Sequence, residues 1–199
     1  MMSVLHIRRI HLYKKDTVLL VFILIFNTAF AQKVAVKSNL LYDATTTPNL
    51  GLELATGKKQ TLQLFYGLNP WKFDDKKKLR HWVLQPEYRW WFCQRFNGSF
   101  VGVHAHSGEF NMAGVKLPFG IWPELKSHRY EGWFAGGGLT YGYQWVLSKH
   151  WNFEASIGAG YAYIKYKKYG CAKCGEKKKD THRHYVGPTK TALSLIYAF

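Results

Sequence analysis

Four residues near the C-terminal end carry side chains that could bind a metal ion or form a covalent cross-link. Cys171 and Cys174 are followed, within one lysine-rich stretch, by His182 and His184. Two thiolates and two imidazoles can hold zinc, although the histidines do not have the spacing of a zinc finger. If the chain is exported, its thiols meet an oxidising compartment, which favours a local Cys171–Cys174 disulfide over free thiols or the zinc set. Cys93 is then left without a partner.

Two further histidines, His104 and His106, share one face of a predicted strand and lie near Ser107 and Glu109. A serine, a histidine and an acid can carry out acyl transfer when they converge. No nucleophile motif accompanies them, and residue types without geometry carry little weight. We interpret the histidines as space-filling side chains. We predict a protein that is not an enzyme and has no cofactor, with a lipid-modifying enzyme as an alternative.

Six charged residues fall on the polar face of predicted strands, three basic and three acidic: Lys37, Arg89, Lys190, Glu53, Glu87 and Glu154. Three positive and three negative charges can neutralise one another. The interior of an eight-stranded barrel is only wide enough for side chains to fill. We therefore predict a paired network that closes the interior, with a small gated pore as the alternative.

The elements that must position these side chains are β-strands. From Trp133 to Tyr166 the residues alternate with a period of two on either side of Leu147–His150, which predicts a long β-hairpin. One face is aliphatic with aromatic ends, and the other is small, polar and rich in glycine. Similar alternation predicts six more strands, of which the fourth is irregular at Pro86: Lys33–Tyr42, Asn49–Ala55, Thr61–Asn69, Trp82–Phe92, Ser99–Ser107 and Pro188–Phe199.

Eight strands of about ten residues predict an all-β fold, an eight-stranded antiparallel up-and-down transmembrane β-barrel. The connections alternate between short turns and longer loops, as in outer-membrane barrels. The apolar face carries aromatic rings at the strand ends, as interfacial girdles require: Tyr42, Tyr66, Trp82, Trp90, Trp133, Trp145 and Tyr163. The alternative is a soluble, lipocalin-like ligand carrier, which has the same period and the opposite polarity.

The first 31 residues are typical of a cleaved signal peptide. Four basic residues precede an apolar run from Thr17 to Phe26, and Ala29-Phe30-Ala31 forms a small-x-small cleavage site. The apolar run is shorter than the ~20 residues that a membrane-spanning helix needs. We therefore expect residues 32–199 to form one exported domain in the outer membrane. Its net charge falls from +16 to +13 on cleavage.

Two long blocks separated by Cys171 and Cys174 carry a resemblance to a known family. They read HRYEGWFAGGGLTYGYQWVLSKHWNFEASIGAGYAYIKY and YVGPTKTALSLIYAF. From Lys33 to Phe199 the chain resembles a domain-of-unknown-function family of short Gram-negative outer-membrane β-barrels. The resemblance implies a small barrel of the OmpA-like transmembrane type, without a known substrate. Tyr197 and Phe199 resemble the terminal aromatic signal that the barrel-assembly machinery reads.

The predicted loops give the remaining functional surface. Residues 70–80 have a net charge of +3 and residues 167–187 a net charge of +5. Because the basic residues lie mainly between the strands and form no known binding module, nucleic acid is not the expected partner. We expect a monomer with a structural or surface-interaction role. Its partners would be outer-membrane lipid, the phosphates of lipopolysaccharide, the barrel-assembly machinery during biogenesis and an unidentified surface partner.

Overall fold

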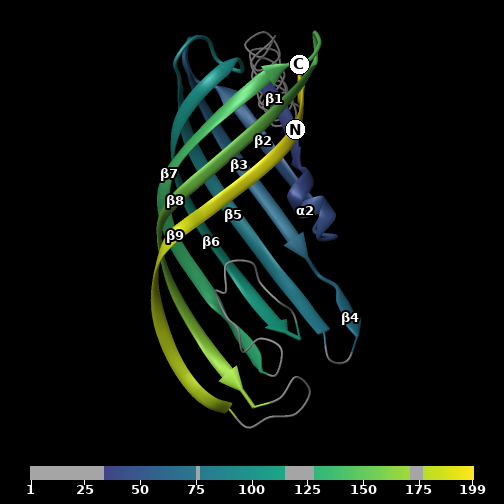
Figure 1. Ribbon diagram of the computed structural model, residues 1–199, viewed down its shortest axis with the longest axis vertical. Helices are drawn as coiled ribbons and strands as arrows, with labels where there is room; N and C mark the ends of the chain where they lie inside the picture. The colour runs from purple at the N-terminus through teal and green to yellow at the C-terminus, as the bar shows by residue number, and fades with distance from the viewer. Residues whose placement is uncertain (1–33, 75–76, 115–127, 171–176) are drawn as a thin grey trace, which may run out of the picture.

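The structure, a computed structural model, describes residues 34–74, 77–114, 128–170 and 177–199 (Figure 1). The predicted signal peptide, Cys171 and Cys174 lie outside these residues. The described elements are mainly strands: β1 (Val34–Asn39), α2 (Leu40–Ala44), β2 (Asn49–Ala55), β3 (Gln60–Asn69), β4 (Lys72–Asp74), β5 (Lys77–Trp91), β6 (Gly98–Ala113), β7 (Arg129–Val146), β8 (Trp151–Tyr169) and β9 (Lys177–Ala198).

Eight of these described strands are hydrogen-bonded in a closed antiparallel ring. Each long strand pairs with the next along the chain, β3 pairs with β5, and β9 returns to pair with β1. The short β4 is outside the ring and pairs with β5. The predicted all-β fold with eight antiparallel strands in up-and-down order is therefore confirmed.

The ring has a polar interior and an apolar exterior. Along β3 the burial alternates strictly, so that Gln63 is buried and Leu62 and Leu64 are exposed. The same alternation leaves Leu139 68% exposed while Glu53 is fully buried. Side chains of successive strand residues point to opposite faces, and the period-two sequence pattern therefore sorts polar side chains inward. This is the reverse of the usual distribution in soluble proteins.

The first strand ends earlier than predicted, at Asn39 and not at Tyr42. β1 stops at Asn39, because the side chain of Asn39 accepts a hydrogen bond from the backbone N–H of Leu41 (3.2 Å) and caps α2. The helix turns Tyr42 into the ring, where it packs edge-on against Phe65 with ring centroids 5.2 Å apart. The prediction that Tyr42 belongs to an outer aromatic girdle is therefore wrong.

Other predicted strands are too short. β8 continues to Tyr169 and β9 begins at Lys177, so most of the predicted loop 167–187 is a paired hairpin. β6 likewise continues to Ala113. Lysines in these segments suggested a loop, but cross-strand hydrogen bonds keep the backbone extended. The predicted irregularity at Pro86 is confirmed, since the β5–β6 ladder is interrupted at Gln85 and Pro86.

The ring is uneven in height. β1 pairs with β9 over five residues, from Ala35–Ala198 to Asn39–Ser194. Beyond this point β9 continues to the far end of the ring (Figure 1), with no strand partner on the β1 side among the residues that the structure describes. The side chain of Asn39 bonds to β9 at the point of separation, through Thr191 O (3.2 Å) and Leu193 N (3.2 Å). Helix α2 thus lies beside the start of the unpaired edge.

Candidate functional site

Arg89 of β5 is the centre of a charged cluster inside the ring, together with Lys37, Lys190, Glu53, Glu87 and Glu154. Its guanidinium makes two hydrogen bonds to Glu154, of 2.8 and 3.0 Å. It also donates to Glu87 (2.8 Å) and Glu53 (3.1 Å). Forked pairing of this kind is among the strongest arrangements of an arginine with a carboxylate. Arg89 thereby links three strands of the ring.

The two lysines complete the cluster. Lys37 of β1 lies between Glu53 (2.5 Å) and Glu154 (2.8 Å), and Lys190 of β9 pairs with Glu87. All six charged residues are at most 8% exposed. Three positive and three negative charges leave the cluster neutral, as burial in a medium of low dielectric requires.

Neighbouring side chains hold the cluster in place. Thr61 donates a hydrogen bond to Glu53 (2.5 Å) and accepts one from the indole of Trp91 (2.9 Å). The Phe100 ring lies under the Arg89 guanidinium, and its centroid is 4.3 Å from Arg89 Cζ. A Cβ added to Gly51 would lie 2.5 Å from the Lys37 side chain, so glycine at this position leaves room for the lysine. The interior is therefore filled at this level.

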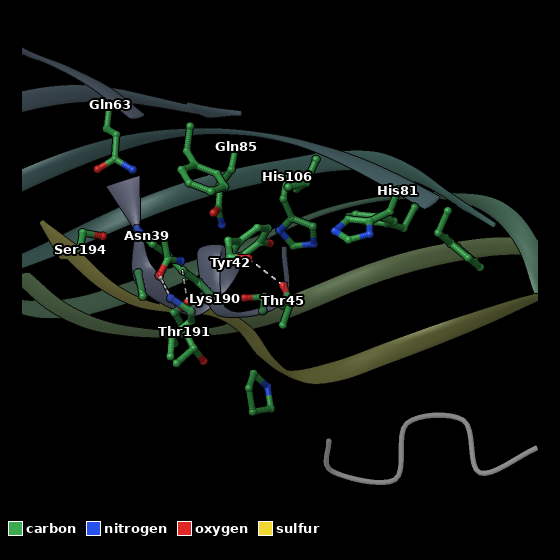
Figure 2. Close-up of a pocket in the computed structure, with 18 of the residues that line it drawn as sticks. Asn39, Tyr42, Thr45, Gln63, His81, Gln85, His106, Lys190, Thr191 and Ser194 are labelled. Atoms are coloured by element: carbon green, nitrogen blue, oxygen red, sulfur yellow. Dashed lines mark hydrogen bonds between the residues drawn. The ribbon is translucent and has the colours of Figure 1, made fainter. Parts of the chain in front are cut away.

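A cavity of about 650 Å³ lies next to the charged cluster (Figure 2). Gln63, Gln85, His106 and His81 follow one another along it in Figure 2, and Tyr42 projects between them from α2. Five apolar side chains also line it: Phe65, Phe110, Met112, Phe134 and Ile164. Its size is within the range of small-molecule sites, about 300–1,000 Å³.

Two polar atoms in the cavity wall lack a hydrogen-bond partner among the described residues, Gln63 Oε1 and His106 Nδ1. Both residues are at least nine-tenths buried, with exposed fractions of 3% and 6%. Buried polar atoms are nearly always paired, so these two mark a place where a ligand or water would be bound.

The two adjacent histidines differ in their surroundings. His104 has a partner at each ring nitrogen, Thr140 (2.8 Å) and Thr189 (2.9 Å), and is fixed by them. Ser107 and Glu109 are exposed on the opposite face of β6, where Glu109 accepts a hydrogen bond from Trp82 (3.1 Å). The serine, the histidines and the acid of the candidate acyl-transfer set therefore do not converge.

Of the four residues of the candidate zinc set, the structure describes only the two histidines. His182 and His184 lie together on the outer face of β9, with ring centroids 5.5 Å apart, and Tyr161 bonds to His184 Nδ1 (2.6 Å). Cys171 and Cys174 fall outside the described residues. Within residues 34–74, 77–114, 128–170 and 177–199, no group of three or more histidine, cysteine and acidic residues could hold a metal ion. Cys93 is an exposed free thiol in the turn after β5.

The terminal aromatic residues lie beside the start of the chain's first strand. Phe199 donates its backbone N–H to Val34 O (3.0 Å), and Tyr197 packs against His150 and Trp151, with ring centroids 5.5 and 5.2 Å apart. The start of β1 and the end of β9 therefore lie together, at the end of the ring that carries the short turns.

The alternation pattern could have identified Gln63 and Gln85 as inward-facing residues. It could not identify Tyr42, whose direction depends on a helix that begins where a strand was predicted. Nor could it reveal the cavity, which has no sequence signal.

Comparison with known protein families identifies a matching family model. Residues 17–199 match a family model described as "Protein of unknown function (DUF3575)". No curated protein matches the chain. In the part of the chain that the structure describes, no helix has the combination of length and hydrophobicity that crossing a membrane requires.

Proposed function

The chain belongs to the DUF3575 family, and we propose that it is a small outer-membrane β-barrel with a sealed interior, acting as a structural or surface-interaction protein. The observation that carries the proposal is the inverted polarity of the ring. Leucines cover the outside of the described strands, and a neutral charged cluster occupies the inside. The localisation, the barrel type and the role are parts of this proposal.

The outer wall supports contact with lipid. Leu64, Leu139 and Ile157 are 47%, 68% and 59% exposed near the middle of their strands. A continuous apolar surface of this kind would cause aggregation in water, whereas a bilayer solvates it. A lipocalin-like carrier would need the opposite arrangement, with its apolar side chains inside.

Aromatic rings border this apolar wall towards both strand ends. Trp145 packs against Phe153 near the short turns, and Trp133 packs against Tyr163 near the other end. Trp133 and Trp145 are twelve residues apart on β7, which is about 40 Å of strand at roughly 3.3 Å per residue. A strand tilt of ~45° reduces this to about 28 Å, close to the ~25 Å apolar band of membrane barrels.

The charged cluster supports a closed interior. Its side chains come from β1, β2, β5, β8 and β9, so they span the ring and not one wall of it. Exposed basic residues at the loop end, among them Arg80, Lys165 and Lys167, support contact with lipopolysaccharide phosphates. A monomer inserted by the barrel-assembly machinery agrees with one closed ring.

Fractionation and gel mobility test the location. The full chain, expressed in a Gram-negative cell, should be recovered in detergent-extracted outer membrane and should change its gel mobility when boiled. Recovery in the soluble periplasm would refute the membrane proposal and favour the ligand carrier.

Planar-bilayer recording tests the sealed interior. The wild-type protein should give no conductance steps, because paired side chains fill the ring. Glu87→Gln removes the negative charge that pairs with Lys190 and Arg89 and one of the two oxygens that accept their hydrogen bonds. A rise in conductance in this variant would show that the cluster is the seal. Stable conductance by the wild-type protein would refute a sealed interior.

A further inference from the structure

The cavity beside the charged cluster has an opening in the wall of the ring. Its lining includes Leu41 of α2, Thr45 at the C-cap of that helix, and Pro188 and Thr191 of β9, and all four residues are exposed. They lie where β9 has separated from β1 and α2 occupies the space beside it. The cavity therefore reaches the outer surface between α2 and β9.

The wall around this opening is apolar. Val186 and Leu193 of β9 are 81% and 37% exposed on the outside, and Pro188 lines both the cavity and an apolar groove on the outer wall. If the ring is embedded in a bilayer, as proposed above, the opening faces acyl chains. A molecule that reaches the cavity by this route must carry a substantial apolar part.

The inside of the cavity changes in polarity along its length. Phe110 and Ile164 belong to a packed apolar cluster with Met112 and Phe134 at its edge, whereas Gln63 and His106 lie nearer the charged cluster. Gln63 Oε1 can only accept a hydrogen bond, and His106 Nδ1 can donate or accept according to its tautomer. A ligand head with two hydroxyl or amide groups, one for each atom, could satisfy both.

The electrostatics favour a neutral head group. Lys37 and Lys190 line the cavity, but Glu53, Glu154 and Glu87 already neutralise them. A carboxylate or phosphate would therefore be buried without a free cation near it, which is costly. A hydroxyl group requires no counter-charge and gains a hydrogen bond to an otherwise unpaired atom.

We propose that the cavity is a binding site for a neutral amphiphile, an acyl chain with a hydroxyl- or amide-bearing head, that enters between α2 and β9. Its chain packs against Phe110, Phe134 and Ile164. Its head bonds to Gln63 and His106. This inference depends on the proposed membrane location, since the opening faces the lipid only if the ring is embedded.

Photo-crosslinking tests the site. The full chain in phospholipid nanodiscs is irradiated with a 1-monoacylglycerol that carries a diazirine in its chain, and the labelled residues are mapped by mass spectrometry. We expect labelling of inward-facing residues of β6 and β7, above all Phe110 and Phe134. Labelling restricted to outward-facing residues such as Leu139 would overturn the proposal, because it would show ordinary contact with bilayer lipid.

Two adjacent residues of β9 provide a matched pair of variants. Ala192 is 6% exposed and lines the cavity, whereas Leu193 is 37% exposed on the outer face. Ala192→Phe should fill the cavity and reduce interior labelling at least fivefold, and Leu193→Phe should leave it unchanged. Equal labelling of both variants would overturn the proposal.

Gln63 provides a second, milder test that does not depend on Ala192→Phe folding. Gln63→Met keeps the size of the side chain and removes the unpaired acceptor, so binding of the monoacylglycerol should weaken roughly tenfold, the effect of about one buried hydrogen bond. A diazirine-bearing fatty acid at pH 8 should label the interior at least tenfold less than the monoacylglycerol. Equal affinity of Gln63→Met and wild type, or preference for the fatty acid, would contradict the proposed head group.

The tests separate this inference from the proposed function. Outer-membrane recovery and heat-dependent mobility, without interior labelling, would overturn the ligand site alone. Recovery in the soluble periplasm would overturn the proposed function, whereas interior labelling of that soluble form would still support a ligand site.

Discussion

Replacing Arg89 should destabilise the folded protein more than any other single change in the charged cluster. Arg89 donates hydrogen bonds to Glu53, Glu87 and Glu154, and it is fully buried. Arg89→Met keeps an unbranched side chain without the guanidinium, and it leaves three carboxylates facing two lysines. Removal of one partner from a buried ion pair costs about 3–5 kcal/mol, and we expect a loss of that size in the free energy of unfolding.

Urea unfolding of the protein in phospholipid vesicles measures the effect, with the folded fraction taken from the heat-dependent gel mobility. Arg129→Met is the matched control. Arg129 pairs with Glu131 at the end of β7, where the two side chains are 25% and 43% exposed. Partly exposed pairs contribute about 0–1 kcal/mol, so this variant should remain close to wild type.

A compensating variant separates charge from packing. Arg89→Met combined with Glu154→Gln restores equal numbers of positive and negative charges, and it should recover more than ~1 kcal/mol of the loss, which is a typical coupling energy for residues in one network. A loss below about 1 kcal/mol for Arg89→Met would refute the importance of the cluster. Absence of any recovery in the double variant would show that packing, and not charge, causes the loss.

Three further predictions concern the outer wall and the two ends of the ring. Leu139→Arg, at a 68% exposed position, should destabilise the membrane-embedded protein by about 2–4 kcal/mol; an unchanged urea midpoint in vesicles would contradict the lipid-facing assignment. The proposed orientation places the short turns in the periplasm. In a variant with Cys171→Ser and Cys174→Ser, the exposed thiol of Cys93 should therefore react with a membrane-impermeant maleimide only after the outer membrane is permeabilised. Labelling of intact cells would show the opposite orientation. Phe199→Ser should lower the amount of heat-modifiable protein in the outer membrane several-fold. Export of a soluble control protein should stay normal. An unchanged amount of the barrel protein would refute the assembly signal.

Much of the ring could be predicted from the sequence because its main signal is local. A period of two assigns each side chain to one face without any knowledge of the partner strand. It placed Glu53, Arg89 and Glu154 on the inner face, and the structure brings these three side chains together. It also placed Leu62 and Leu64 on the outer face, where they are exposed.

The errors come from features that the alternation pattern does not report: a helix cap, and contacts between residues far apart in the chain. Tyr42 changes direction because one side chain, that of Asn39, caps a helix and ends the strand. The segment after Tyr166 looks like a charged loop, but its pairing with residues after Lys177 makes it a strand. The cavity depends on ring diameter, on which strands end early and on the sizes of facing side chains, and none of these has a pattern along the chain.

Among the described strands, a contact of only five residue pairs between β1 and β9 closes the ring. The β9 residues that join β1 are Ser194–Ala198. Without this contact, both the first and the last strand carry unsatisfied backbone edges, which readily pair with other chains. Loss of Ser194–Ala198, for example through trimming by an exopeptidase, would therefore leave the sheet open between β1 and β9 rather than only slightly shorter.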